Sequence, residues 1–235
     1  MIINSWWSKN SVPTFNTMYS ERFKNSDAVL LFWEACNFID GLNGLLIGYS
    51  IFIFFSLLIQ SGNYSFEVYD INFIYLFICA LIILFIFNIS GVIFLGDNGS
   101  YVLSTILGFY LLDLFINNQF LSPYYIAILL WYPAFENLYS LIRRINLRQN
   151  VSVADNAHIH HFVYRYIIDK EFINRKYANS ISTIAILIFN VPSFILANIY
   201  STNTKILISL IFSNIIIYLF VYYFFFKYFK FKKKS

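Results

Sequence analysis

The chain has little charge and few cysteines, and each shortage excludes a class of protein. Only 12% of its 235 residues are charged, whereas 59% are hydrophobic. Soluble domains carry about twice that share of charge, so an ordinary soluble domain is excluded. The two cysteines, Cys36 and Cys79, both lie in apolar stretches. Their number and placement favour neither a disulfide framework nor a paired-cysteine zinc site.

A signal-peptide pattern is also missing. Residues 1–27 are polar and lack a basic start, an apolar centre and a small-residue cleavage site. We therefore divide the chain into a polar N-terminal segment, 1–27, and a transmembrane domain, 28–235. The beginning of the chain does not explain how the protein enters a membrane.

Long apolar runs recur through the rest of the chain, and short polar breaks separate the first four of them. Backbone groups in lipid must bond within their own segment, so uniformly apolar runs of this length favour helices over barrel strands. The fold class predicted is all-α, a polytopic transmembrane bundle of about six spans. The predicted spans are 42–60, 71–95, 101–118, 121–141, 179–200 and 205–226.

Lysine and arginine set the predicted orientation, because they are retained on the cytoplasmic side of short loops. If the first span leaves the cytoplasm, the loop 143–178 and the tail 227–235 both lie inside, and together they hold twelve basic residues. The outer boundaries hold only Lys205. The C-terminal lysines would also suit an anionic inner leaflet, although we favour a plain topology anchor.

The first polar motif is NFIDGLNG, from Asn37 to Gly44. Asn37, Asp40 and Asn43 would line one face of a helix if the segment is helical. The alternative is a glycine-rich turn with Asp40 as a cap before a membrane helix.

A second motif, FLGDNGS, places Asp97 between two glycines and ends at Ser100, which could cap the next helix. Free N–H groups at a helix start favour anions, and one carboxylate together with substrate phosphates commonly holds Mg²⁺. A tight cytoplasmic turn explains the same residues.

All three histidines of the chain, His158, His160 and His161, lie within four residues. They could bind a phosphate, transfer a proton or ligate zinc, and a surface loop is the remaining alternative. Arg144 ends the fourth predicted span beside Arg143. Arginine pairs well with phosphate, but retention of positive charge inside explains this pair without a ligand.

Four segments together resemble the polyprenyl-phosphate N-acetylhexosamine-1-phosphate transferases, glycosyltransferase family 4. These segments are Asn37–Gly44, Phe94–Ser100, Glu136–Arg144 and Asp155–His161. They stand in the family's order, and the charge argument places all of them on the cytoplasmic side.

The resemblance implies transfer of an N-acetylhexosamine 1-phosphate from a UDP-sugar to undecaprenyl phosphate, with release of UMP. It implies a multi-pass protein of the bacterial inner membrane that initiates a cell-envelope polysaccharide, such as a cell-wall or lipopolysaccharide unit, without a nucleic-acid partner. Asp97 would hold Mg²⁺, or Mn²⁺, and Asp40 would share the catalytic role. The implied substrate-binding residues are Asn37, Asn43, Arg144, His158, His160 and His161.

The chain departs from the family pattern at several points. Glu34, Asn43 and Asn156 replace the residues that many members carry, which obscures the sugar specificity. Residues 1–36 contain no adjacent aspartates, and the apolar stretch 28–38 is too short to span a membrane. We therefore expect the chain to represent the later part of a longer member and to be inactive alone. The alternatives are a non-catalytic remnant and a membrane transporter.

Overall fold

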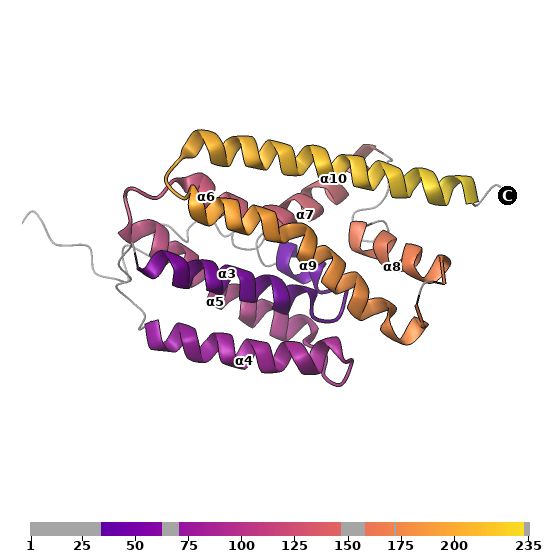
Figure 1. Cartoon of the computed structure of the whole chain (residues 1–235), viewed down its shortest axis with the longest axis horizontal. Helices are drawn as coiled ribbons and strands as arrows, with labels where there is room; N and C mark the ends of the chain where they lie inside the picture. The colour runs from indigo at the N-terminus through magenta and orange to yellow at the C-terminus, as the bar shows by residue number, and fades with distance from the viewer. Residues whose placement is uncertain (1–33, 63–70, 147–157, 172, 233–235) are drawn as a thin grey trace, which may run out of the picture.

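The computed structural model describes residues 34–62, 71–146, 158–171 and 173–232, and every regular element within these ranges is a helix (Figure 1). The predicted all-α class is confirmed. The predictions for residues 1–27, Asp155 and Asn156 lie outside the described residues.

Four of the described helices are long and apolar enough to cross a membrane. A fifth, α3, covers Leu45–Ser61 and is equally apolar but shorter. The predicted membrane bundle is therefore confirmed, although fewer single helices of spanning length are present than the six expected. The four long helices are α4 (Ile71–Ile89), α5 (Gly96–Asn117), α9 (Arg175–Ile199) and α10 (Thr204–Lys232).

The outer surface of the bundle is apolar. Leu76 and Ile83 on α4 and Phe220 on α10 are 68%, 58% and 73% exposed. Large apolar side chains on an outer surface are costly in water but suit contact with lipid tails. The outward faces of α4 and α10 therefore support the membrane environment that the composition predicts.

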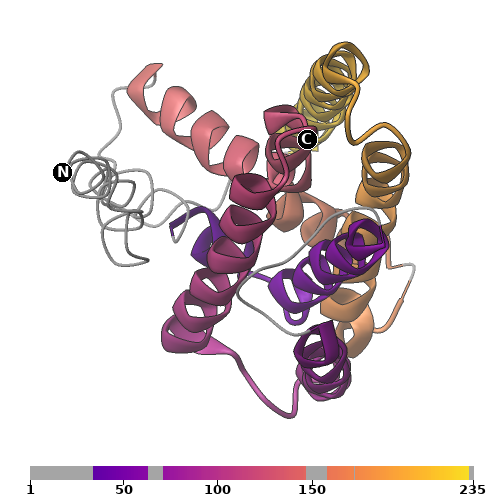
Figure 2. The ribbon, with the colours of Figure 1, turned by 90° about the vertical axis from the view of Figure 1, so that its left-hand side faces the viewer.

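The helix α3 lies in the middle of the bundle and packs against α4, α5 and α9 (Figures 1 and 2). Gly44 precedes it with φ of 82°, a left-handed conformation that glycine adopts without strain. In Figure 1 the start of α3, the end of α4 and the starts of α5 and α9 lie at the same end of the bundle.

The predicted span 121–141 is wrong as a single helix. The structure has two helices there, α6 (Pro123–Leu129) and α7 (Trp131–Asn146), which meet at Leu130. Pro133 explains the break, because proline in a helix lacks an N–H and its ring clashes with the carbonyl four residues earlier, here that of Leu129. In the first turn of a new helix the same proline is tolerated.

A further helix, α8 (Ile159–Asp169), lies within the predicted cytoplasmic segment 143–178. Its end is held against the end of α10. Asp169 accepts hydrogen bonds from Lys232 and, at 2.7 Å, from the hydroxyl of Tyr228. The helix also packs against α9, so its two long neighbours hold it in place.

At the opposite end of the bundle, Asn198 of α9 joins three helices. Its amide nitrogen donates to Ser56 of α3 at 2.9 Å, and its side-chain oxygen accepts from Gln60 at 3.2 Å and from the Tyr125 hydroxyl of α6 at 2.9 Å. Side-chain amides that bond across helices stabilise membrane bundles in this way. This network secures the end remote from the histidines.

Candidate functional site

The first motif folds as a short helix followed by a turn. Residues 34–39 are helical, and the backbone then turns through Asp40 to Gly44 before α3 begins. Asn37, Asp40 and Asn43 therefore do not share one helix face, contrary to the prediction. The alternative of a glycine-rich turn describes the backbone, although Gly44 rather than Asp40 occupies the N-cap position.

The second motif forms the first turn of α5 instead of a loop between spans. Asp97 is exposed in this first turn, where the partial positive charge of the helix start favours a carboxylate. Ser100 lies inside the helix, so it does not cap it. Its hydroxyl contacts the side-chain oxygen of Asn37 at 2.8 Å. This hydrogen bond joins the first two motifs across 63 residues of sequence.

The three histidines lie at the start of α8 with their rings close together. The ring centroids of His158 and His160 are 5.2 Å apart with nearly parallel planes, and those of His160 and His161 are 4.4 Å apart. Phe38, from the first motif, lies against His158 at 5.4 Å between centroids. The histidine cluster is therefore packed onto the first motif.

Gly41 makes the closest approach between these segments. A Cβ atom added there would lie 2.8 Å from Nε2 of His160 and 3.7 Å from Cε1 of His161. Only a residue without a side chain leaves room for the imidazole at this position. The contact brings the histidine cluster next to Asp40, and thus joins the first and fourth motifs.

Two groups at this junction have displaced pKa values. Burial, and then the nearby Asp97 carboxylate, raise the pKa of Asp40 to about 7. For His160, burial and the two neighbouring imidazoles hold the pKa well below its usual value of 6.5. His160 is thus a neutral imidazole at physiological pH. Displaced pKa values of this kind are enriched at functional sites, although structural clusters also produce them.

Asn43 and Arg144 are held by other elements of the bundle. The backbone of Asn43 is bound to α9, through its N–H to Asn179 at 2.9 Å and its carbonyl to Thr183 at 2.8 Å. Arg144 is buried on α7. The structure therefore brings Asn37, Asp40, Asp97 and the histidines toward one junction.

Glu136 was not among the site residues predicted from the sequence. It lies on α7 at 1% exposure and contacts His158 Nδ1 at 3.1 Å through Oε1. A lone carboxylate in an otherwise apolar predicted span was the available signal, because such groups are costly in a membrane and often functional. Its partner, 22 residues away, could not be identified without the fold.

The described residues contain no group of three or more histidine, cysteine, aspartate or glutamate side chains arranged to hold a metal ion. A zinc site formed by the histidine cluster therefore has no support there. Asp40 and Asp97 remain as two carboxylates close enough for one to raise the pKa of the other. Mg²⁺ requires no more than this from a protein, because water and substrate phosphates commonly complete its coordination.

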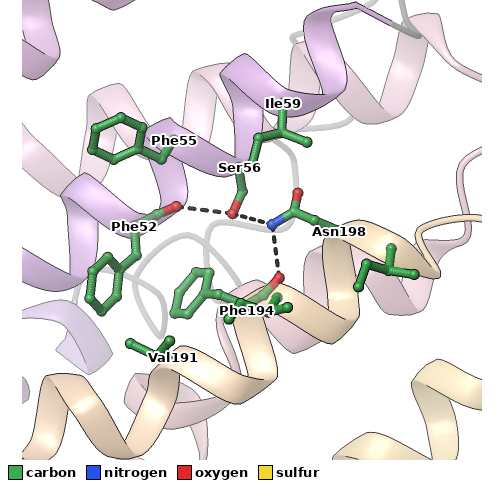
Figure 3. Close-up of a pocket in the computed structure, with 9 residues that line it drawn as sticks. Phe52, Phe55, Ser56, Ile59, Val191, Phe194 and Asn198 are labelled. Carbon is green, nitrogen blue, oxygen red and sulfur yellow. Dashed lines mark hydrogen bonds between the residues drawn. The ribbon is translucent and has the colours of Figure 1, made fainter.

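An apolar groove of about 500 Å³ lies between α3 and α9, well away from the histidines (Figure 3). Phe52, Phe55 and Phe194 contribute to its walls, and the hydrogen bond from Asn198 to Ser56 crosses its base. Among the described residues, no titratable side chain lines it. The groove therefore offers no group for phosphate or proton chemistry.

The fold and the site define a helical membrane protein with carboxylates, amides and imidazoles gathered at one end. Residues 26–115 match the model of glycosyl transferase family 4. The resemblance predicted from the motifs is confirmed. The match includes Asn37, Asp40 and Asp97 and ends before Glu136 and the histidines.

Two curated proteins are similar to the chain. It is 30% identical over 130 residues to a probable undecaprenyl-phosphate N-acetylglucosaminyl 1-phosphate transferase of Bacillus subtilis (strain 168), covering 54% of this chain and 36% of that protein. It is 30% identical over 135 residues to an undecaprenyl-phosphate alpha-N-acetylglucosaminyl 1-phosphate transferase of Thermotoga maritima, covering 57% and 40%. The chain thus spans less than half the length of these relatives. No solved structure matches it.

Proposed function

We propose that this chain forms part of a polyprenyl-phosphate sugar-1-phosphate transferase. The reaction moves an N-acetylhexosamine 1-phosphate from a UDP-sugar to undecaprenyl phosphate and releases UMP. The lipid product initiates a cell-envelope polysaccharide at the cytoplasmic face of a bacterial inner membrane. The family of residues 26–115 and the two similar transferases support this reaction class.

One observation carries the proposal, namely that motifs far apart in the sequence meet at one end of the bundle. The Ser100–Asn37 hydrogen bond joins the first two motifs, and the contact of His160 with Gly41 joins the first to the histidines. Chance polar residues in a membrane protein have no reason to converge in this way. Phosphoryl transfer needs such convergence, because the protein contributes mainly positioning and charge stabilisation.

A divalent cation fits the pair Asp40 and Asp97. Burial and mutual repulsion make ionisation of Asp40 unfavourable, and both causes would be reduced by a cation beside the two carboxylates. Mg²⁺, or Mn²⁺, would be held by Asp97 with Asp40 nearby, and would neutralise charge on the diphosphate of the donor. Asn37 is placed to orient this region through its bond to Ser100.

The remaining residues bind the donor. His160 is neutral, so it serves as a hydrogen-bond partner for a phosphate or sugar oxygen rather than as a positive charge. His158 and His161 lie against it, with ring centroids 5.2 and 4.4 Å from that of His160. Arg144 supplies the positive charge, and Asn43 lines the edge of the site where the first motif meets α9.

The test uses the full chain in lipid bilayers with UDP-N-acetylglucosamine, other UDP-N-acetylhexosamines, undecaprenyl phosphate and Mg²⁺. Because we expect the chain alone to be inactive, the assay is repeated with the N-terminal part of a similar transferase supplied. There we expect UMP release that requires the lipid, and a loss of about 10²- to 10³-fold in Asp97→Asn, since one electrostatic contact to the developing charge is removed. Asn98→Ala, a change at the exposed neighbouring position, serves as the control.

Two results contradict the proposal. One is UMP release that persists at the wild-type rate in Asp97→Asn. The other is an absence of turnover with every UDP-N-acetylhexosamine when the N-terminal part of a similar transferase is supplied.

A further inference from the structure

The helix α7 has an unusual distribution of side chains. Its buried face carries the polar residues Glu136, Ser140 and Arg144 at intervals of four, whereas its exposed face carries Leu138, Leu141, Ile142 and Ile145. A helix of a soluble protein buries its apolar stripe. In α7 the apolar stripe faces outward, so the polar face must find its partners inside the bundle.

Glu136 finds its partners at the beginning of α8. Its Oε1 atom accepts a hydrogen bond from the backbone N–H of Ile159 at 2.8 Å and lies 3.1 Å from His158 Nδ1. His158 is the N-cap residue of α8, and its own side chain caps no backbone group. A helix start leaves its first N–H groups without partners within the helix. Glu136 therefore acts as the cap that α8 lacks, supplied by another helix.

The same oxygen determines which nitrogen of His158 carries the proton. A carboxylate accepts hydrogen bonds, so the nitrogen that faces it, Nδ1, is the protonated one. The opposite nitrogen, Nε2, is then an acceptor whenever the ring is neutral. Glu136 and His158 are 1% and 3% exposed, so water does not compete for this bond.

The orientation of His158 is transmitted to the other rings. His160 stacks on His158 with planes only 7° apart, and His160 in turn lies against Gly41. A rotation or shift of His158 would thus displace His160 relative to Asp40. Neither ring nitrogen of His160 has a hydrogen-bond partner among the described residues, so packing alone holds this ring.

We infer that Glu136 is a positioning residue, which holds His158 in its Nδ1–H form and anchors the start of α8, so that the histidine cluster faces Asp40 and Gly41. Its importance for turnover rests on the proposed function. Its structural effect does not, and can be measured without substrate.

The chain has only three histidines, all in this cluster, so ¹⁵N-histidine labelling gives three sets of ring signals from the full chain in lipid bilayers. The ring assigned to His158, by its loss in His158→Gln, should be protonated at Nδ1. Glu136→Gln retains an acceptor and should preserve this state. Glu136→Leu removes the acceptor and should shift the ring toward the Nε2–H form. Leu138→Ala, on the outward face of α7, should change neither.

A His158 ring that is protonated at Nε2 in the wild type, or that is unchanged in Glu136→Leu, overturns the inference. Helix content and unfolding temperature are measured for each variant. If Glu136→Leu does not fold, the wild-type and Glu136→Gln spectra still decide the outcome, because Nδ1 protonation is required in both.

A double-mutant cycle measures the effect on turnover. Glu136→Leu should lower kcat by about 10- to 100-fold, the cost of a misplaced group near the reacting atoms. In the His158→Gln background it should cause little further loss, because residues that act through one another are not additive. Additive losses in kcat would show that Glu136 does not act through His158. Turnover is measured with the N-terminal part of a similar transferase supplied. If the wild type shows none there, the proposed function is contradicted instead, and the ring signals then decide the role of Glu136.

Discussion

Gly41 offers the most direct test of how the site is assembled. The Cβ of Gly41→Ala would lie 2.8 Å from Nε2 of His160, whereas ordinary contacts begin near 3.4 Å. The ring or the turn must therefore move by about half an ångström, and His160 is fully buried between the other two imidazoles. Forcing an extra methyl group into a packed position typically costs about 1–3 kcal/mol.

We expect Gly41→Ala to lower the free energy of unfolding by an amount in this range and to shift the ring signals of His160. Turnover should fall by about 10- to 100-fold, because displacements below 1 Å in a catalytic arrangement have effects of this order. The assays are thermal unfolding in detergent, ¹⁵N-histidine spectra and UMP release.

Gly62→Ala provides the matched control. Gly62 has φ of −71° and ψ of −21°, a conformation that alanine adopts readily, and an added Cβ there meets no atom within 4 Å. It should leave all three measurements unchanged or raise stability slightly. If Gly41→Ala behaves like Gly62→Ala, with unshifted His160 signals, the close contact between the first motif and the histidine cluster is refuted.

Three further predictions concern pH, packing and topology. Because the folded state disfavours protonated His160, the free energy of unfolding should fall by up to about 1.4 kcal/mol per pH unit below pH 6.5. Protonation of Asp40 acts with the opposite sign, so the quantity to measure is the difference in unfolding free energy between wild type and His160→Gln as a function of pH. Parallel curves for the two proteins would contradict the prediction. Asn198→Leu should cost about 1–3 kcal/mol in thermal unfolding, because it removes the side-chain hydrogen bonds that join Ser56, Gln60 and Tyr125 to α9. Wild-type stability would show that the network contributes nothing. The orientation is tested in a chain whose native cysteines have been replaced. An impermeant thiol reagent should label Asn203→Cys in intact cells, whereas it should label Lys230→Cys only after the cells are permeabilised. The reverse pattern would show that the predicted orientation is inverted.

The buried polar face of α7 extends beyond its contact with the histidines. Glu136 and Arg144 lie on one helix face eight residues apart, about 12 Å along the axis. Glu136 reaches the histidines directly, whereas Arg144 lies two turns further on.

The sequence by itself determined that the chain resides in lipid and that its fold is all-α. Uniformly apolar runs must be helical in lipid, because their backbone groups have no other partners there, and this depends only on composition and length. It also predicted the resemblance to glycosyl transferase family 4, since Asn37–Gly44 and Phe94–Ser100 are local motifs that can be recognised without knowing what surrounds them. The predicted boundaries were less accurate where a single residue had more effect than the mean hydropathy of the span. Pro133 is the example, because it divides the predicted span 121–141 into α6 and α7.

Only the tertiary structure decided which of these residues touch. The pairing of Glu136 with His158, the contact of His160 with Gly41 and the bond from Ser100 to Asn37 each join segments that are distant in the chain. Such contacts depend on how helices cross and on which faces they present, and neither is encoded in a local pattern. In a membrane bundle the apolar side of a helix faces lipid, and polar side chains can face the interior. The apolar periodicity of α7 alone therefore could not show that its polar face is the buried one.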